Sequence, residues 1–210
     1  MNELATQQPL KKIRVWDAPT RIFHWVLAIS FAGAMITQDM ENLRLVHITF
    51  GYTMLGLVGF RLLWGVLGTR YARFKEFVPT PAKVIAYVKS MAAGRPESFL
   101  GHNPLGALAI IAMLSLTIGS AVSGILLEQG FSEELFEEVH EVLSNTLLVV
   151  VGGHLLGVVL SSVMHKESLV PPMISGRKVG SPTAEIRANY NWVAAILAAA
   201  IAYLWFVQLS

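Results

Sequence analysis

Apolar residues gather in five long stretches of the chain, and the segments between the stretches hold most of its charges. A helix needs about 20 mostly apolar residues to cross the hydrocarbon core of a bilayer. The stretches cover residues 22–38, 45–69, 103–127, 142–164 and 188–210, and Arg61 is the one Asp, Glu, Lys or Arg inside them. The pattern therefore predicts an all-α integral membrane protein with five transmembrane helices.

The composition agrees with a membrane protein and excludes several other classes. Charged residues make up 14% of the 210 residues, against about 25% in ordinary soluble domains. The formal net charge of +2 argues against a nucleic-acid partner. The chain has no cysteine, which excludes disulfides, iron–sulfur clusters, thiolate zinc sites and covalently attached c-type haem.

The charges divide unequally between the two sides of the predicted membrane. One side holds 15 of the 16 basic residues with six acidic residues, a net charge of +9, and the other holds Arg44 with eight acidic residues, a net charge of −7. Cytoplasmic segments are enriched in Lys and Arg. We therefore expect a multi-pass protein of the bacterial inner membrane, with a cytoplasmic N-terminus and a periplasmic C-terminus.

The same pattern divides the chain into four parts. We expect a cytoplasmic N-terminal segment at residues 1–20 and a four-helix domain at 21–165, which includes a long cytoplasmic loop at about 68–102. A second cytoplasmic loop at 166–187 and a fifth transmembrane helix at 188–210 follow. The long basic lead argues that the first helix is retained rather than cleaved as a signal peptide.

The long loop contains one further helix signal. Thr80-Pro81 is typical of an N-cap followed by proline at the first helical position. Val84, Val88 and Met91 then share one face, which predicts an interfacial helix on the cytoplasmic surface.

Four histidines fall at matching depths in the predicted helices. His24 lies on the cytoplasmic side of the first helix and His47 on the outer side of the second. His140 and His154 lie on the fourth helix, about 21 Å apart along its axis. Their side chains point in directions that differ by about 40° around that axis, so they share one face. The expected pairs are His24 with His154 and His47 with His140.

Paired imidazoles on facing helices favour haem. Haem iron accepts axial nitrogen ligands within helix bundles, whereas zinc needs about four clustered ligands and proton relays usually include a carboxylate, which the five stretches lack. We therefore expect two non-covalent b haems, with His24, His154, His47 and His140 as iron ligands. Neighbouring glycines could admit a planar group or allow close helix packing: Gly51, Gly152, Gly153 and Gly157.

Two other histidines and two arginines have less specific roles. We expect His102 and His165 to be interfacial rather than ligands. Arg21 and Arg61 could pair with haem propionates, or could extend to lipid headgroups.

Several motifs together resemble one family. They are the segment VWDAPTRIFHW at residues 15–25, His47 with Gly51, Arg61 followed by Trp64-Gly65, the segment GHNPLG at 101–106, and the His140/His154 spacing. They are similar to the bacterial and nickel–iron-hydrogenase b-type cytochromes, the prokaryotic cytochrome b-561 group, over about residues 13–165.

The resemblance implies a four-helix dihaem bundle with the four histidines above as ligands, and the fifth helix lies outside that pattern. It also implies respiratory electron transfer between the membrane quinone pool and a periplasmic electron-transfer protein or oxidoreductase subunit. The acidic residues after the third stretch could dock that partner or form a solvated loop: Glu128, Glu133, Glu134, Glu137 and Glu138.

Two alternatives remain open at this point. One is a self-contained quinone oxidoreductase that acts on a small reductant such as superoxide. The other is a membrane anchor or transporter without a cofactor, in which intramembrane polar residues line a path or simply pack: Ser115, Thr117, Ser120 and Ser123.

Overall fold

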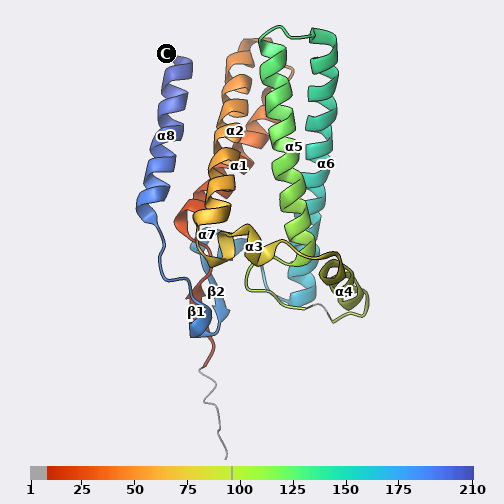
Figure 1. The fold of residues 1–210 in the computed structure, drawn as a ribbon, viewed down its shortest axis with the longest axis vertical. Coiled ribbons are helices and arrows are strands. Elements are labelled where there is room, and N and C mark those ends of the chain that lie inside the picture. Colours follow the sequence, from red (N-terminus) through yellow and green to blue (C-terminus); the bar gives the residue numbers. More distant parts are fainter. Residues whose placement is uncertain (1–8, 96) are drawn as a thin grey trace, which may run out of the picture.

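Five long helices run side by side in the computed structural model, which describes residues 9–95 and 97–210 (Figure 1). Each helix is long and apolar enough to cross a membrane, which confirms the five predicted spans. They are α1 (Ala18–Thr37), α2 (Arg44–Leu67), α5 (Pro104–Glu128), α6 (Glu133–His165) and α8 (Asn191–Leu209). The first eight residues of the expected N-terminal segment lie outside the described residues.

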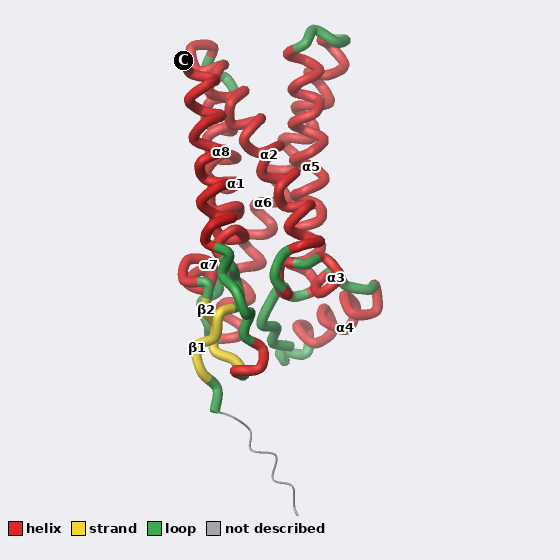
Figure 2. Tube along the Cα trace, turned by 60° about the vertical axis from the view of Figure 1, so that its left-hand side comes forward, coloured by secondary structure: helices red, strands yellow, loops and turns green. Residues whose placement is uncertain are grey.

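The helices pack as two pairs with α8 at the side. α1 packs along α2, α5 packs along α6, and contacts between α2 and α5 join the two pairs. α8 lies against α1 and α2, away from α6 (Figures 1 and 2). The central core is made of Phe23, Leu57, Val58 and Leu114.

The outer faces of α6 and α8 are strongly apolar. Exposed side chains there include Leu155, Leu156, Val159, Ile196 and Phe206. Apolar surface on this scale is unusual for a water-soluble protein and suits contact with lipid chains.

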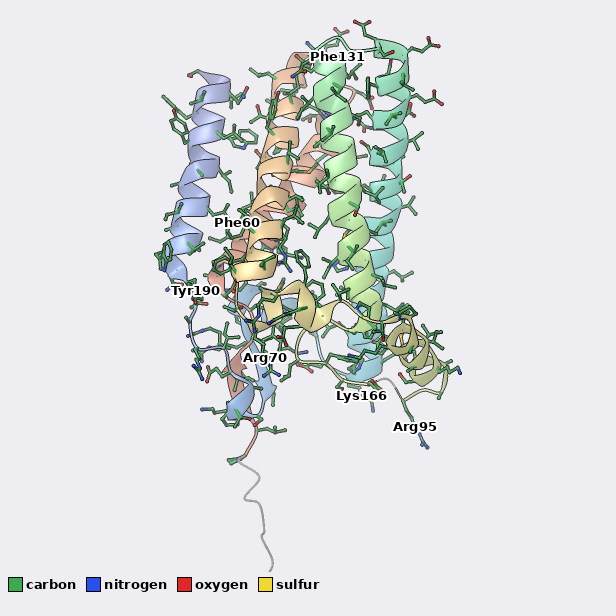
Figure 3. All side chains as sticks on the ribbon, in the orientation of Figure 1. Phe60, Arg70, Arg95, Phe131, Lys166 and Tyr190 are labelled. Carbon is green, nitrogen blue, oxygen red and sulfur yellow. The ribbon has the colours of Figure 1, made fainter. Side chains whose placement is uncertain are left out.

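The two ends of the bundle differ in charge. The acidic end comprises the 3₁₀ turn η1 (Glu41–Leu43) between α1 and α2 and the turn between α5 and α6, where Figure 3 labels Phe131. The basic end carries Arg70, Arg95 and Lys166 in the same view. It contains the short elements η2 (Arg70–Ala72), α3 (Phe74–Phe77), α4 (Pro81–Ala92), α7 (Val170–Ser175) and η3 (Pro182–Ala184).

The structure contains a small antiparallel sheet at the basic end, where the sequence analysis predicted loops. Strand β1 (Lys11–Arg14) pairs with β2 (Arg177–Gly180), with Lys11 opposite Gly180. Ile13 and Val15 are fully buried against Tyr71 and Met173, while Lys12 is exposed. Alternation of buried and exposed residues over so short a strand is a weak sequence signal. The sheet nevertheless joins the N-terminal segment to the loop before α8.

The expected helix at Pro81 is present as α4, with Pro81 in its first turn. Its buried face differs from the prediction, because Tyr87 is 1% exposed while Val88 is 45% exposed. Val84 and Met91 are half-buried, so the inward face runs through Val84, Tyr87 and Met91, at i, i+3 and i+7.

Candidate functional site

The outer pair of histidines meets between α2 and α6 as predicted. The ring centroids of His47 and His140 are 6.2 Å apart and the ring planes are inclined at 76°. Two imidazoles bound to one metal ion through nitrogens at about 2 Å would have ring centres about 6 Å apart. The spacing therefore fits a single metal ion held between the two rings.

Backbone carbonyls set the orientation of both rings. Nδ1 of His47 lies 3.0 Å from the oxygen of Ala34 on α1, and Nδ1 of His140 lies 2.8 Å from the oxygen of Ser120 on α5. A carbonyl oxygen only accepts hydrogen bonds, so each Nδ1 carries the proton. Each Nε2 then has a free lone pair, which is the usual state of a metal-ligating histidine.

A cavity of about 650 Å³ contains this pair, and side chains from α1, α2, α5 and α6 line it. The volume lies within the range of about 300–1,000 Å³ that is usual for cofactor pockets. Gly51 is in the wall, and a Cβ built there would meet no atom within 4 Å. Gly124 is closer to the histidine pair, since a Cβ there would lie 3.0 Å from Cε1 of His140.

Sequence reasoning missed the residues that orient these rings. Ser120 and Gly124 fall one helical turn apart on α5 and face His140, and Ala34 on α1 faces His47. The available signal was the set of polar residues Ser115, Thr117, Ser120 and Ser123, which we interpreted as helix packing or a polar path, and Gly124 was not among them. Helix rotation decides between these roles, and the sequence does not show it.

The inner histidines gather at the basic end. His24 on α1 and His154 on α6 lie close enough for their charges to interact, and His102 interacts with both. Nδ1 of His24 is buried and has no hydrogen-bond partner among the described residues. The three inner histidines therefore lie in one region of the bundle, and Nδ1 of His24 is available there.

The glycines of α6 are not at tight helix contacts. A Cβ added at Gly152, Gly153 or Gly157 would meet nothing within 4 Å. All three glycines are exposed on the surface of α6.

His102 lies in the segment directly before α5, and its Nδ1 is buried. The rings of Trp16 and Phe77 are its close neighbours, with ring centroids 4.7 Å and 4.6 Å away. Burial, with smaller effects of Arg61 and the other inner histidines, lowers the pKa of His102 to about 3. The side chain is thus neutral at physiological pH.

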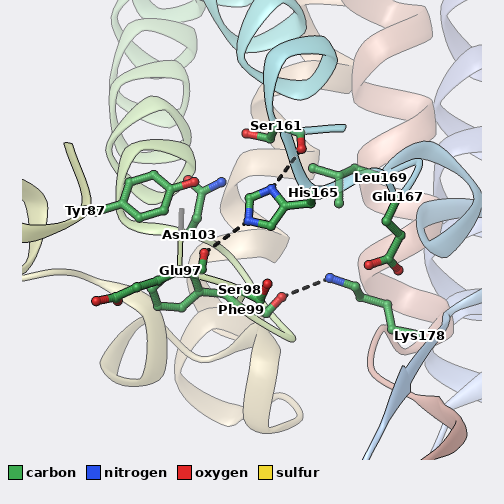
Figure 4. Close-up of a pocket in the computed structure, with 11 residues that line it drawn as sticks. Tyr87, Glu97, Ser98, Phe99, Asn103, Ser161, His165, Glu167, Leu169 and Lys178 are labelled. Atoms are coloured by element: carbon green, nitrogen blue, oxygen red, sulfur yellow. Dashed lines mark hydrogen bonds between the residues drawn. The ribbon is translucent and has the colours of Figure 1, made fainter. Parts of the chain in front are cut away.

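His165 lies beyond the inner pair, in a small cavity of about 50 Å³ (Figure 4). Its Nδ1 is 2.8 Å from the oxygen of Ser161 and its Nε2 is 3.2 Å from the oxygen of Glu97. Both ring nitrogens are therefore engaged with the backbone. Lys178 lines the same cavity, where burial lowers its pKa and Nζ donates to the oxygen of Phe99.

The two arginines have different surroundings. Nη1 of Arg21 donates to the oxygen of Ile174 at 2.6 Å, which holds α7 against α1. Arg61 is 3% exposed, and its guanidinium lies 4.9 Å from the ring centroid of Phe74. Arg61 is therefore buried and does not extend to lipid headgroups.

Asp17 joins the start of α1 to the end of α2. Its carboxylate is fully buried and accepts from the backbone N–H of Thr20 at 2.8 Å, from Nε1 of Trp64 at 3.1 Å and from Oγ1 of Thr69 at 2.6 Å. This carboxylate fixes the entry of α1 and so the position of His24.

The fold and the site together define a multi-pass helical membrane protein with paired histidines inside its bundle. The model of the family described as prokaryotic cytochrome b561 matches residues 15–176, and the chain belongs to this family. It is accordingly a b-type cytochrome of electron transport, with haem b as its cofactor.

Curated relatives carry names of the same kind. The "Probable Ni/Fe-hydrogenase B-type cytochrome subunit" of Azotobacter vinelandii is 26% identical over 78% of this chain and 87% of its own length. The protein of that name in Bradyrhizobium diazoefficiens is 25% identical over 79% and 85%. The "Probable Ni/Fe-hydrogenase 1 B-type cytochrome subunit" of Escherichia coli is 25% identical over 57% and 61%. No solved structure matches the chain.

The donor set of the structure fits haem. Among the described residues no group of three or more His, Cys, Asp or Glu side chains could hold a metal ion by itself. Haem needs only two axial protein ligands, and the outer pair supplies two correctly spaced imidazoles in a cavity of cofactor size.

Proposed function

We propose that this cytochrome carries electrons across the membrane through two b haems, one held by His47 and His140 and the other by His24 and His154. The outer pair carries the proposal, because its 6.2 Å ring spacing and its carbonyl-bound Nδ1 atoms are what two axial ligands require. When bound, haem iron supplies one-electron exchange at each pair.

The chain's own residues separate the two sites and restrict their chemistry. His140 and His154 are about 21 Å apart along α6, so each pair serves one leaflet. Two imidazoles per iron leave no open coordination position. The histidines therefore favour electron transfer over oxygen binding at iron.

The charge asymmetry supports an orientation with the basic end in the cytoplasm and the acidic end in the periplasm. Glu128, Glu137 and Glu141 line the cavity of the outer pair. We propose that a periplasmic oxidoreductase subunit or electron carrier docks here through a basic surface. The names of the relatives point to a hydrogenase as the kind of partner, and the membrane quinone pool is the proposed exchange partner within the bilayer.

Haem content and single histidine variants test this function. Detergent-purified protein should show a b-type reduced-minus-oxidised spectrum with two haems per chain. His140→Ala should lose the outer haem and keep the inner one, and His24→Ala should do the reverse. His165→Ala is the matched control and should keep both, because its ring nitrogens face carbonyl oxygens. Absence of haem from the wild type, or loss of haem in the control, would contradict the proposal.

A further inference from the structure

We infer that Arg61 and His102 form a carboxylate-binding site at the basic end, and that the carboxylate is a propionate of the inner haem. The inference rests on the proposed function in that it requires a haem between His24 and His154. It assigns to His102 a role that is neither iron ligation nor surface exposure.

Two buried polar atoms from separate parts of the chain carry the argument. Nη1 of Arg61 on α2 and Nδ1 of His102, in the segment before α5, are both buried without a hydrogen-bond partner among the described residues. Buried polar groups are nearly always paired, because leaving one unpaired is costly. Two neighbouring unpaired groups therefore indicate an acceptor that the chain itself does not provide.

One aromatic ring lies close to both groups. Both lie against Phe77, with Cζ of Arg61 5.7 Å and the ring of His102 4.6 Å from its centroid. Phe74 also lies close to the guanidinium, and Trp16 also lies close to the imidazole. These contacts fix the donors in an apolar wall, where a hydrogen bond to a charged acceptor is strong.

The charge of Arg61 also requires an anion. A guanidinium that is 3% exposed is costly unless it is paired. Asp17 is near enough to interact with it, but among the described residues the two form no ion pair, and three donors already occupy the Asp17 carboxylate. A carboxylate beside Arg61 would supply the direct partner that Asp17 does not.

Position identifies the source of that carboxylate. His102 interacts with His24, His154 and Arg61, so the two donors border the proposed inner haem. The propionates are the charged groups at the edge of a b haem, and the planar guanidinium matches a carboxylate in bidentate geometry. A soluble anion from the cytoplasm has the same chemistry and is distinguished by experiment.

Redox titration of the holoprotein tests the site. Removing the cation should favour the oxidised haem, so Arg61→Gln should lower the midpoint potential of the inner haem and leave the outer one unchanged. We expect about a tenfold change in the reduced-to-oxidised ratio at a fixed potential, which is about 59 mV for one electron. Arg61→Lys should restore part of the shift. His102→Leu should lower the potential in the same direction, and His102→Gln, which keeps an N–H donor, should lower it less.

Arg70→Gln is the matched control, because Arg70 is an arginine of the same end whose side chain is 57% exposed. It should leave both potentials unchanged. Equal shifts of both haems, or no shift in Arg61→Gln and His102→Leu at full haem content, would overturn the inference while leaving the dihaem function intact. A wild-type protein without haem would instead refute the proposed function.

Titration with inorganic phosphate or acetate distinguishes a haem propionate from a soluble anion at this site. With a haem propionate in place, neither anion should change the inner potential of the wild type. A concentration-dependent change in the wild type that Arg61→Gln abolishes would show a soluble anion at this site and refute the propionate assignment.

Discussion

At the scale of single residues, the outer site depends on small groups that orient large ones. The carbonyl of Ser120 fixes the tautomer of His140, and Gly124 leaves room for its ring. Such neighbours decide whether an imidazole presents its lone pair in the right direction. They belong to a different helix from the histidine, so their effect depends on how α5 and α6 are rotated against each other.

Gly124→Ala should disturb the outer haem because its Cβ would lie 3.0 Å from Cε1 of His140. The ring must then move away from its position over the Ser120 carbonyl. We expect weaker outer-haem binding and an altered low-spin signal in electron paramagnetic resonance, with the inner signal unchanged.

Gly119→Ala is a close control for that variant. It lies on the same helix, and its Cβ would lie 3.1 Å from Cδ1 of Leu143, an apolar side chain that can shift. It should preserve both haem signals. If the two variants behave alike, general helix packing rather than the histidine would explain the effect.

The sequence predicted that His47 and His140 lie near each other, because helix length and charge bias fix depth. His140 and His154 share a helix, so their separation follows from the helical rise. The surroundings of His102 were not predictable in this way, because Trp16 and Phe77 reach it from segments far away in the chain. A short loop segment carries no periodic pattern that would reveal burial.

At the scale of elements, helix ends are held by polar side chains. Asp17 caps α1 and Asn103 caps α5 through the N–H of Gly106 at 2.7 Å. Asp17 also accepts from Trp64 and Thr69, so it connects two helices as well as ending one. On the opposite side, Nε1 of Trp205 on α8 donates to Oγ1 of Thr53 on α2 at 3.0 Å, which seats the fifth helix against the bundle.

Asp17→Ala should therefore destabilise the protein more than Asn103→Ala. The Asn103 variant loses one cap, at about 1 kcal/mol. The Asp17 variant loses a cap and two hydrogen bonds to a charged acceptor, so we expect its free energy of unfolding to fall by about 3 kcal/mol or more. Denaturant titration in detergent, followed by circular dichroism, measures both. Equal losses would show that the links to α2 contribute nothing.

At the scale of the whole molecule, the net charge of +2 conceals a separation of charge, because basic and acidic residues gather at opposite ends of the bundle. Arg70, Arg95 and Lys166 lie at the end that holds the sheet, α4 and α7 (Figure 3). The opposite end is acidic apart from Arg44, which forms an ion pair with Glu128. The sheet itself was not predictable, because its two strands are four residues long and come from opposite ends of the sequence. It lies at the basic end, whereas residues of the acidic end such as Glu41 and Glu128 line the cavity of the outer pair.

The proposed orientation follows from this separation, and the lack of cysteine makes it directly measurable. Glu134 at the acidic end and Lys75 at the basic end are both exposed, so a single cysteine at either position should preserve the fold. In intact spheroplasts a membrane-impermeant maleimide should label Glu134→Cys and should label Lys75→Cys only after lysis. The reverse labelling would place the basic end in the periplasm. It would also move the proposed docking surface to the cytoplasm, because the acidic residues and the outer histidine pair share one end of the bundle.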